Sequence, residues 1–199
     1  MNSRAFLTLS ILFFQANSHA MEEQSDLTLK NFIPLISKKA IKQRIHDTAH
    51  QLSSEYPGKP LTLVMVMKGA LHITSDLSRS LENATTLEFI QASSYGANGT
   101  QSGELTVTGL EKLNLKGKDV LLIDDIFDTG KTITRVKAEL LKQNPASLKT
   151  VVLLLKKKER DTKELPDYSL FTIENEFVIG YGLDYKEQFR ELPDIWVKK

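Results

Sequence analysis

Three apolar runs place the strongest limit on how this chain can fold. They span residues 61–67, 120–124 and 148–155 and are rich in Leu, Val and Ile. Such runs are typical of strands that are buried on both faces of a parallel sheet. Segments with apolar residues at helical spacing alternate with them, over residues 37–55, 70–81 and 133–141. This alternation predicts one α/β domain, a mostly parallel twisted sheet flanked by helices.

A hairpin is expected between the first and second of these runs. Residues 87–92 and 105–108 have strand character, and Ser93–Gly103 between them is small and polar with three glycines. We therefore predict a long hairpin with a mobile loop at its tip. Two further short strands are expected near the end of the chain, at residues 171–173 and 177–179.

The composition excludes several classes of protein. The 26 basic and 25 acidic residues give a net charge of +1, so no overall field draws the chain to nucleic acid or to an anionic membrane. The chain has no cysteine, which excludes disulfides, thiolate zinc sites, iron–sulfur clusters and cysteine nucleophiles. Its 199 residues fit one domain better than two.

The segment 120–132 carries the densest group of chemically active residues. A buried strand runs into Asp124 and Asp125, Asp128 follows, and Thr-Gly-Lys-Thr then opens a helix. The run Gly130-Lys131-Thr132 is similar to the end of a nucleotide-binding P-loop, but that motif needs a glycine where Asp125 stands. Carboxylates at that point would also repel the phosphates. We therefore reject a P-loop.

The order of these residues instead suits a ligand with separate phosphate and hydroxyl ends. The backbone N–H groups of Thr129–Thr132, at a helix N-terminus, suit a phosphate. The first two aspartates can accept hydrogen bonds from a sugar diol or hold a divalent cation, and Asp128 is placed to move a proton between the two ends. The alternative is that Asp128 caps the helix and the other two end a strand. Three aspartates within five residues favour the functional interpretation.

The segment 120–132 resembles the phosphoribosyl-pyrophosphate (PRPP) signature of the type I phosphoribosyltransferases. That signature does not specify the base, and it also occurs in regulators that bind PRPP or nucleotides without catalysis. Open parallel sheets bind ligands beyond the carboxyl ends of their strands. The residues that follow the other expected strands should therefore indicate which of these functions the chain has.

Two segments resemble the loops that surround PRPP in this family. Lys68-Gly69 follows the first core strand, and the resemblance makes it the pyrophosphate loop, which often contains a cis peptide bond; Gly69 allows an anion to approach closely. An ordinary glycine turn with a solvated lysine is the alternative. Ser94-Tyr95 resembles the mobile lid of the purine phosphoribosyltransferases, which excludes water from the reaction. A hairpin tip with glycines needs no such role.

The run Phe177–Tyr185 closely resembles the tail signature of the hypoxanthine–guanine phosphoribosyltransferases. The resemblance implies that Phe177 stacks on the purine, that Val178 reads its edge through the backbone, and that Asp184 coordinates Mg²⁺. Phe177 provides a π-face and Asp184 a hard oxygen ligand. Taken alone, Phe177 would be interpreted as an ordinary core residue.

Two basic residues complete the resemblance. Lys156 corresponds to the lysine that donates to the exocyclic O6 of the purine, and an ammonium group selects a 6-oxopurine over adenine because it has only donors. Arg190 corresponds to the arginine that grips pyrophosphate with its planar fork. The alternatives are that Lys156 belongs to a solvated charge run and that Arg190 is a surface residue.

The resemblance covers residues 33–197 and implies a hypoxanthine–guanine phosphoribosyltransferase, which converts a 6-oxopurine and PRPP into IMP or GMP and pyrophosphate. It implies Mg²⁺ at Asp124, Asp125 and Asp184, Asp128 as the base that removes the N7 proton, and a homodimer or homotetramer. Asp124 departs from the glutamate of many members but keeps the charge. A phosphoribosyltransferase for xanthine or another base, and a non-catalytic PRPP-binding regulator, are the rivals. The ranking of hypoxanthine, guanine and xanthine stays open.

The first twenty residues have the pattern of a secretory signal, with Arg4, an apolar run over residues 5–14, and small residues around His19. The apolar run is too short to span a membrane as a helix. The other interpretation is that translation begins at Met21. The resemblance favours it, because it implies a substrate, PRPP, that is found in the cytosol. We expect residues 1–20 to lie outside the fold, residues 21–199 to form the catalytic domain, and the protein to be cytoplasmic; a genuine signal would make it exported.

Overall fold

A computed structural model of the protein describes residues 29–94, 105–158 and 164–199. Within them, a main sheet has the strand order β4-β3-β2-β5-β6-β7. Its strands are β2 (Leu61–Met67), β3 (Thr85–Ser94), β4 (Leu105–Thr108), β5 (Asp119–Phe127), β6 (Ser147–Lys156) and β7 (Tyr168–Ile173). All neighbouring pairs are parallel except β3 with β4, which is antiparallel. The predicted mostly parallel sheet is therefore confirmed, as is the pairing of the two hairpin strands.

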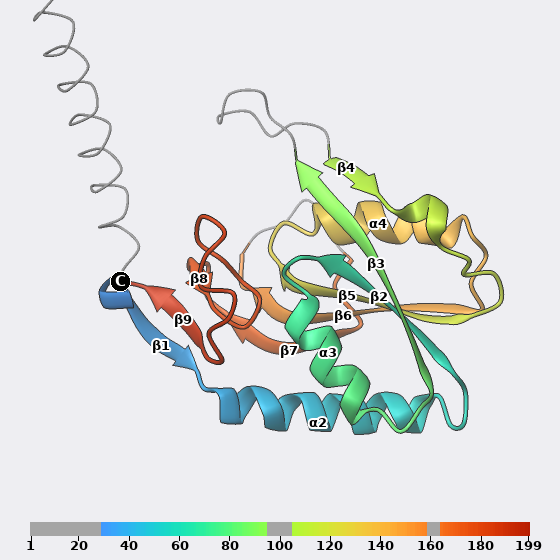
Figure 1. Cartoon of the computed structure of the whole chain (residues 1–199), viewed down its shortest axis with the longest axis horizontal. Helices are drawn as coiled ribbons and strands as arrows, with labels where there is room; N and C mark the ends of the chain where they lie inside the picture. The colour runs from blue at the N-terminus through green and yellow to red at the C-terminus, as the bar shows by residue number, and fades with distance from the viewer. Residues whose placement is uncertain (1–28, 95–104, 159–163) are drawn as a thin grey trace, which may run out of the picture.

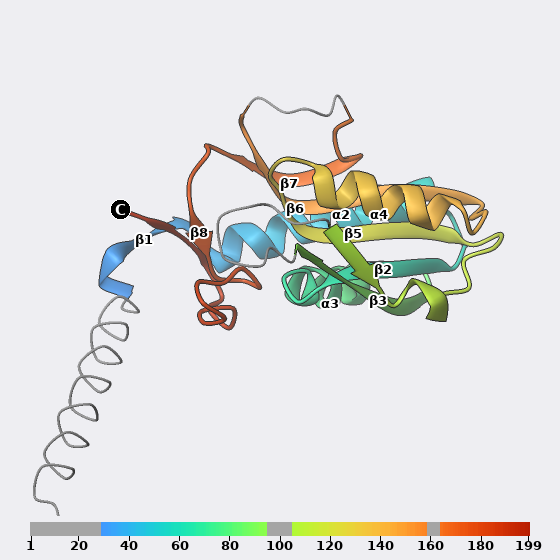
Figure 2. The same cartoon turned by 90° about the horizontal axis from the view of Figure 1, so that it is seen from above.

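Helices cover both faces of this sheet. Helices α2 (Lys38–Glu55) and α3 (Leu71–Ser80) lie on one face, and α4 (Lys131–Leu141) lies on the other (Figures 1 and 2). Helix α2 begins after Ser37, whose hydroxyl accepts a hydrogen bond from the Ala40 N–H, a common way to satisfy a free donor at a helix start.

Burial on both faces explains why the central strands are apolar throughout. In β2, Leu61 and Leu63 pack into the core beneath α2 and α3, while Val64 and Val66 pack into the core beneath α4. Successive side chains of a strand point to opposite faces, so a strand between two helical layers needs apolar residues at every position.

A second, smaller sheet stands beside the main one. It consists of β1 (Phe32–Ile36), β9 (Ile195–Lys198) and β8 (Val178–Ile179), which pair antiparallel in that order. Residues 177–179 were expected to form a strand, but β1 and β9 were not predicted. In Figure 1 this sheet lies on the side where β2 and β5 end. Short 3₁₀ helices occupy Leu29–Asn31 and Leu110–Lys112.

None of the helices in the described ranges is both long and apolar enough to cross a lipid bilayer.

Candidate active site

Strand β5 carries the two adjacent aspartates into the interior. The sequence predicted that this strand ends at Asp124, but it continues to Phe127, so Asp124 and Asp125 lie within it and point to opposite faces. Asp124 is only 6% exposed, and its carboxylate accepts a hydrogen bond of 3.0 Å from the Asp125 N–H. Burial raises the pKa of Asp124 well above its usual value, and the charge of Asp125 raises it further. Burial also raises the pKa of Asp125, while Arg190 opposes that shift.

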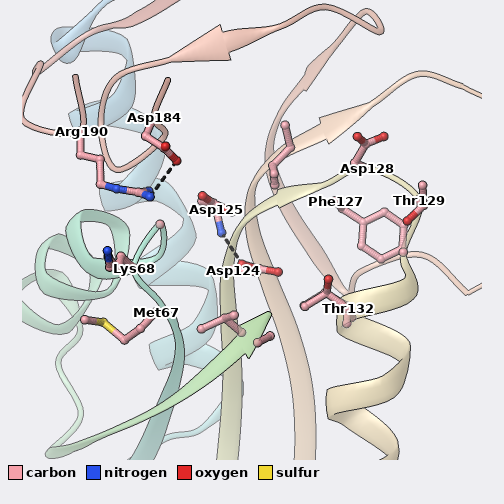
Figure 3. Close-up of a pocket in the computed structure, with 16 residues that line it drawn as sticks. Met67, Lys68, Asp124, Asp125, Phe127, Asp128, Thr129, Thr132, Asp184 and Arg190 are labelled. Carbon is pink, nitrogen blue, oxygen red and sulfur yellow. Dashed lines mark hydrogen bonds and ion pairs between the residues drawn. The ribbon is translucent and has the colours of Figure 1, made fainter. Parts of the chain in front are cut away.

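A cavity of about 310 Å³ opens at the carboxyl ends of β2 and β5 (Figure 3). Most of the predicted site residues line it: Lys68, Gly69, Asp124, Asp125, Asp128, Thr129, Gly130, Thr132, Asp184 and Arg190. In Figure 3, Arg190 and Asp184 stand on one side, Asp128 and Thr129 on the other, and the two adjacent aspartates between them. The fold therefore brings together residues that are up to 122 positions apart in the sequence (68 to 190).

The other predicted residues lie outside this lining. Lys131 is exposed on the first turn of α4, Phe177 is 45% exposed, and Val178 is buried in β8. Lys156, the last residue of β6, adjoins the cavity because its Nζ lies 3.6 Å from Asp128 Oδ2. Ser94 ends β3, and Tyr95 and the loop that follows it lie outside the described residues, so the lid stays a prediction.

The loop after β2 is held by close contacts on two sides. The Met67–Lys68 peptide bond is cis, as the resemblance implied. A Cβ atom at Gly69 would overlap the carboxylate of Asp125, and a Cβ at Gly182 would overlap the carbonyl oxygen of Gly69. Gly182 also has a φ of +102°, a conformation that side chains rarely adopt. Because neither glycine carries a side chain, the loop after β2 can lie against both β5 and the segment around Gly182.

Arg190 and Asp184 form the wall opposite α4. The guanidinium of Arg190 lies 2.7 Å from Asp184 Oδ1 and donates a hydrogen bond of 2.7 Å to the Gly182 carbonyl oxygen. The Glu187 N–H donates to Asp184 Oδ2 at 2.9 Å. Both oxygens of the Asp184 carboxylate are thus oriented by the chain around them.

Glu187 lies between Lys68 and Arg190, the two residues predicted to bind pyrophosphate, and was not itself predicted as a site residue. Its carboxylate accepts a hydrogen bond of 2.6 Å from Lys68 Nζ and lies 3.5 Å from Arg190 Nη2. The hydrogen bond from Lys68 lowers the pKa of Glu187. The signal in the sequence was weak, because a glutamate in a polar turn looks like any solvated residue.

Helix α4 directs its N-terminus toward the cavity. Gly130 precedes the helix with a φ of +82°, and the Thr129 hydroxyl accepts a hydrogen bond of 3.4 Å from the Lys131 N–H. The free N–H groups and the helix dipole at such an end favour an anion. The phosphate site at this helix end stays a prediction.

Asp128, between β5 and α4, pairs with two lysines. Besides Lys156, the ammonium group of Lys158 forms an ion pair with Asp128 Oδ1. Lys158 stands in a run of basic residues, a pattern typical of a solvated turn, and its contact with Asp128 was not predicted.

The carboxylates of the cavity suit a magnesium ion that a substrate also helps to hold. Among the residues with described positions, no three His, Cys, Asp or Glu side chains are close enough to hold a metal ion by themselves. Mg²⁺ is commonly held by one or two carboxylates together with water and substrate phosphates. Asp124, Asp125 and Asp184 supply carboxylate oxygens to one cavity, two of them with pKa values raised by burial. This donor set fits a magnesium ion that arrives with a phosphorylated substrate.

Comparisons with known proteins agree with this geometry. Residues 35–186 match the family model described as a phosphoribosyl transferase domain. The hypoxanthine-guanine phosphoribosyltransferase of Dictyostelium discoideum is 40% identical over 163 residues, which are 80% of this chain and 91% of that protein.

Solved structures give the same result. A hypoxanthine-guanine phosphoribosyltransferase from Bacillus anthracis superimposes with a TM-score of 0.78 and 32% identity, over 84% of this chain and 98% of that one. The hypoxanthine phosphoribosyltransferase from Trypanosoma cruzi, in complex with the product IMP, gives 0.76 and 38%, over 83% and 93%. The fold is therefore that of the type I phosphoribosyltransferases. By the family model and by these relatives, the chain belongs to the hypoxanthine–guanine phosphoribosyltransferase family.

Proposed function

We propose that the protein transfers the 5-phosphoribosyl group from PRPP to a 6-oxopurine, hypoxanthine or guanine or both, in purine salvage. The products are IMP or GMP and pyrophosphate. The observation that carries this proposal is the pair formed by Lys156 and Asp128, whose Nζ and Oδ2 atoms lie 3.6 Å apart at the edge of the cavity.

This pair is complementary to one edge of a 6-oxopurine. O6 accepts a hydrogen bond, and the N7–H beside it donates one. The Lys156 ammonium has only donors and the Asp128 carboxylate only acceptors, so the two match that edge in order. Adenine presents an amino group in place of O6, and a pyrimidine has no N7. The base recognised is therefore a 6-oxopurine.

The other residues of the cavity suit the parts of PRPP. Thr129, Gly130, Lys131 and Thr132 would bind the 5′-phosphate at the start of α4. Asp124 and Asp125 would accept hydrogen bonds from the ribose hydroxyls. On the opposite wall, Lys68, Gly69 and Arg190 would bind the pyrophosphate group.

The purine would lie between this cavity and the small sheet. Phe177 would stack on the ring, and the backbone of Val178 would read its edge. Phe177 is exposed and makes an edge-on contact with the ring of Tyr185, with centroids 5.6 Å apart. An exposed face of this kind is available to a heterocycle. Ser94 and Tyr95 would belong to a lid that excludes water.

In the reaction, N9 of the purine attacks the anomeric carbon of PRPP, and the bond from that carbon to pyrophosphate breaks. Asp128 accepts the N7 proton during this attack, so no positive charge remains on the purine ring. Lys68 and Arg190 stabilise the charge that develops on the leaving group. Mg²⁺, when bound through Asp184 and the two aspartates of β5, supplies further positive charge to the pyrophosphate.

We also propose that the enzyme is cytoplasmic, acts as a homodimer or homotetramer, and needs no nucleic acid or membrane. A xanthine-specific enzyme is the nearest alternative, because xanthine carries the same O6 and N7 edge. A regulator that binds PRPP without catalysis is not favoured, because the relatives reported above are named as enzymes.

A spectrophotometric assay of the full chain with PRPP and Mg²⁺ tests the proposal. Hypoxanthine, guanine, xanthine, adenine and uracil are compared at equal concentration. We expect turnover of hypoxanthine or guanine, none of adenine or uracil, and loss of turnover with excess EDTA. If PRPP binds but no base reacts, the protein is a PRPP-binding regulator and Asp128 is a structural residue.

A further inference from the structure

The three consecutive lysines after β6 do not point the same way. Lys156 and Lys158 both pair with Asp128, whereas Lys157 pairs with Glu174 at 2.7 Å, beyond the end of β7. The alternation of side chains in a strand continues past the last residue of β6, because the Lys157 N–H still donates a hydrogen bond of 2.8 Å to the Ile173 carbonyl oxygen. The backbone therefore holds every second lysine toward the cavity.

The two lysines that face Asp128 hold different oxygens of its carboxylate. Lys156 lies near Oδ2, and Lys158 pairs with Oδ1. Their side chains are 13% and 24% exposed and that of Asp128 is 42% exposed, while Lys157 and Glu174 are 61% and 65% exposed. Ion pairs between exposed groups contribute little, but a partly buried pair is screened less by water and salt. Lys158 is therefore placed to orient Asp128, and Lys157 is not.

We propose that Lys158 is a positioning residue for the base Asp128, which it holds through Oδ1 so that Oδ2 faces the purine. This inference rests on the proposed function, since it assigns Lys158 a part in the same proton transfer. Rotation about the terminal torsion of an aspartate is loosely restricted. Lys156 restricts it weakly, because its Nζ lies 3.6 Å from Oδ2, beyond hydrogen-bond distance, and it is also proposed to donate to O6 of the purine. Lys158 has no such second task.

The expected consequence is a loss in the chemical step with PRPP binding unchanged. In single-turnover measurements with saturating purine and PRPP, Lys158→Ala should lower the rate of nucleotide formation by about 10- to 10²-fold, since a displacement of about 1 Å at a reacting group can cost about 10²-fold. The dissociation constant for PRPP should stay within about twofold, because Lys158 pairs with Asp128 and not with a residue proposed to bind the phosphates. Lys158→Arg should recover most of the rate. Lys157→Ala is the matched control and should behave like the wild type.

A double-mutant cycle separates positioning from a general structural effect. Asp128→Asn alone should lower the rate by about 10²–10⁴-fold. If Lys158 acts through Asp128, adding Lys158→Ala to that variant should cause no further loss. An additive loss, a Lys158→Ala enzyme as fast as the Lys157→Ala control, or PRPP binding that weakens in parallel with the rate would each overturn the proposal. Lys158→Met, which keeps the length of the side chain, replaces the alanine variant if that one unfolds.

The outcomes also separate this inference from the proposed function. If the wild type turns over no 6-oxopurine, the proposed function fails before any variant is compared. If the wild type is active and the cycle is additive, the function stands and the role of Lys158 is wrong.

Discussion

Gly69 and Asp125 lie so close together that no side chain fits between them. The space that a Cβ atom at Gly69 would need is filled by the carboxylate of Asp125. A side chain at Gly69 would therefore push the Asp125 carboxylate out of its place and into the cavity that it lines. The predicted pyrophosphate loop and the predicted ribose site are thus built against one another.

Gly69→Ala should therefore damage both parts of the site at once. We expect a loss of about 1–3 kcal/mol in the free energy of unfolding, typical of overpacking, and a large fall in kcat/KM for PRPP. Thermal melting and steady-state kinetics measure the two effects. Gly58→Ala is the control, since a Cβ there meets no neighbour and only the positive φ of 67° is unfavourable. Normal kinetics for Gly69→Ala would mean that the contact has no role in PRPP binding.

Asp124→Asn should stabilise the free enzyme at neutral pH. Burial raises the pKa of Asp124 above its value in the unfolded chain, so folding becomes less favourable as the pH rises from the unfolded pKa through the folded one. The amide has no charge to bury. The variant should melt at a higher temperature than the wild type at pH 8, and the difference should shrink toward acid pH, while its activity falls. A difference in melting temperature that grows on acidification would contradict the burial argument.

Glu187→Gln should strengthen the binding of free pyrophosphate. In the free enzyme, Glu187 holds Lys68 and lies beside Arg190, so the ligand must compete with it for both cations. The pair is exposed, and exposed ion pairs contribute about 0–1 kcal/mol, so we expect at most about fivefold tighter binding by titration calorimetry. Glu174→Gln removes an exposed pair of similar length and should change nothing. Weaker binding would instead show that Glu187 orients the two cations for the ligand.

Lys156→Gln should relax the choice between 6-oxopurines and 6-aminopurines. A glutamine side chain offers both a donor and an acceptor, so it can face either O6 or an amino group. The ratio of kcat/KM for hypoxanthine to that for adenine should fall by at least about 10-fold, the scale of one lost charged hydrogen bond. An unchanged ratio would remove Lys156 from base recognition.

The central strands could be predicted because their environment leaves a local signature. Residues 61–67 form β2 with the predicted bounds, since burial on both faces requires an unbroken apolar run. Strands β1 and β9 leave no such signature: in β1 only Phe32 is buried, and the strand also contains Pro34. Each depends on a partner from the other end of the chain, and that pairing cannot be seen in either segment alone.

The candidate site likewise contains residues that could be predicted from the sequence and residues that could not. Asp124, Asp125 and Asp128 stand in one short segment, and their density was visible in the sequence. Glu187 and Lys158 belong to polar turns, and nothing in their neighbours distinguishes them from solvated charges. Their contacts with Lys68 and Asp128 depend on how segments far apart in the sequence meet in space. The alternating directions of the three lysines became apparent only once the end of β6 was known.

The pairing of β9 with both β1 and β8 makes the order of synthesis matter. Until residues 195–198 have left the ribosome, β1 and β8 have no strand between them, and the segment that carries Phe177 and Val178 lacks its neighbour. The main sheet can form earlier from residues 61–173. A nascent chain should therefore form the start of α4, the proposed 5′-phosphate site, before the segment that carries Phe177 and Val178 is held in place by β9.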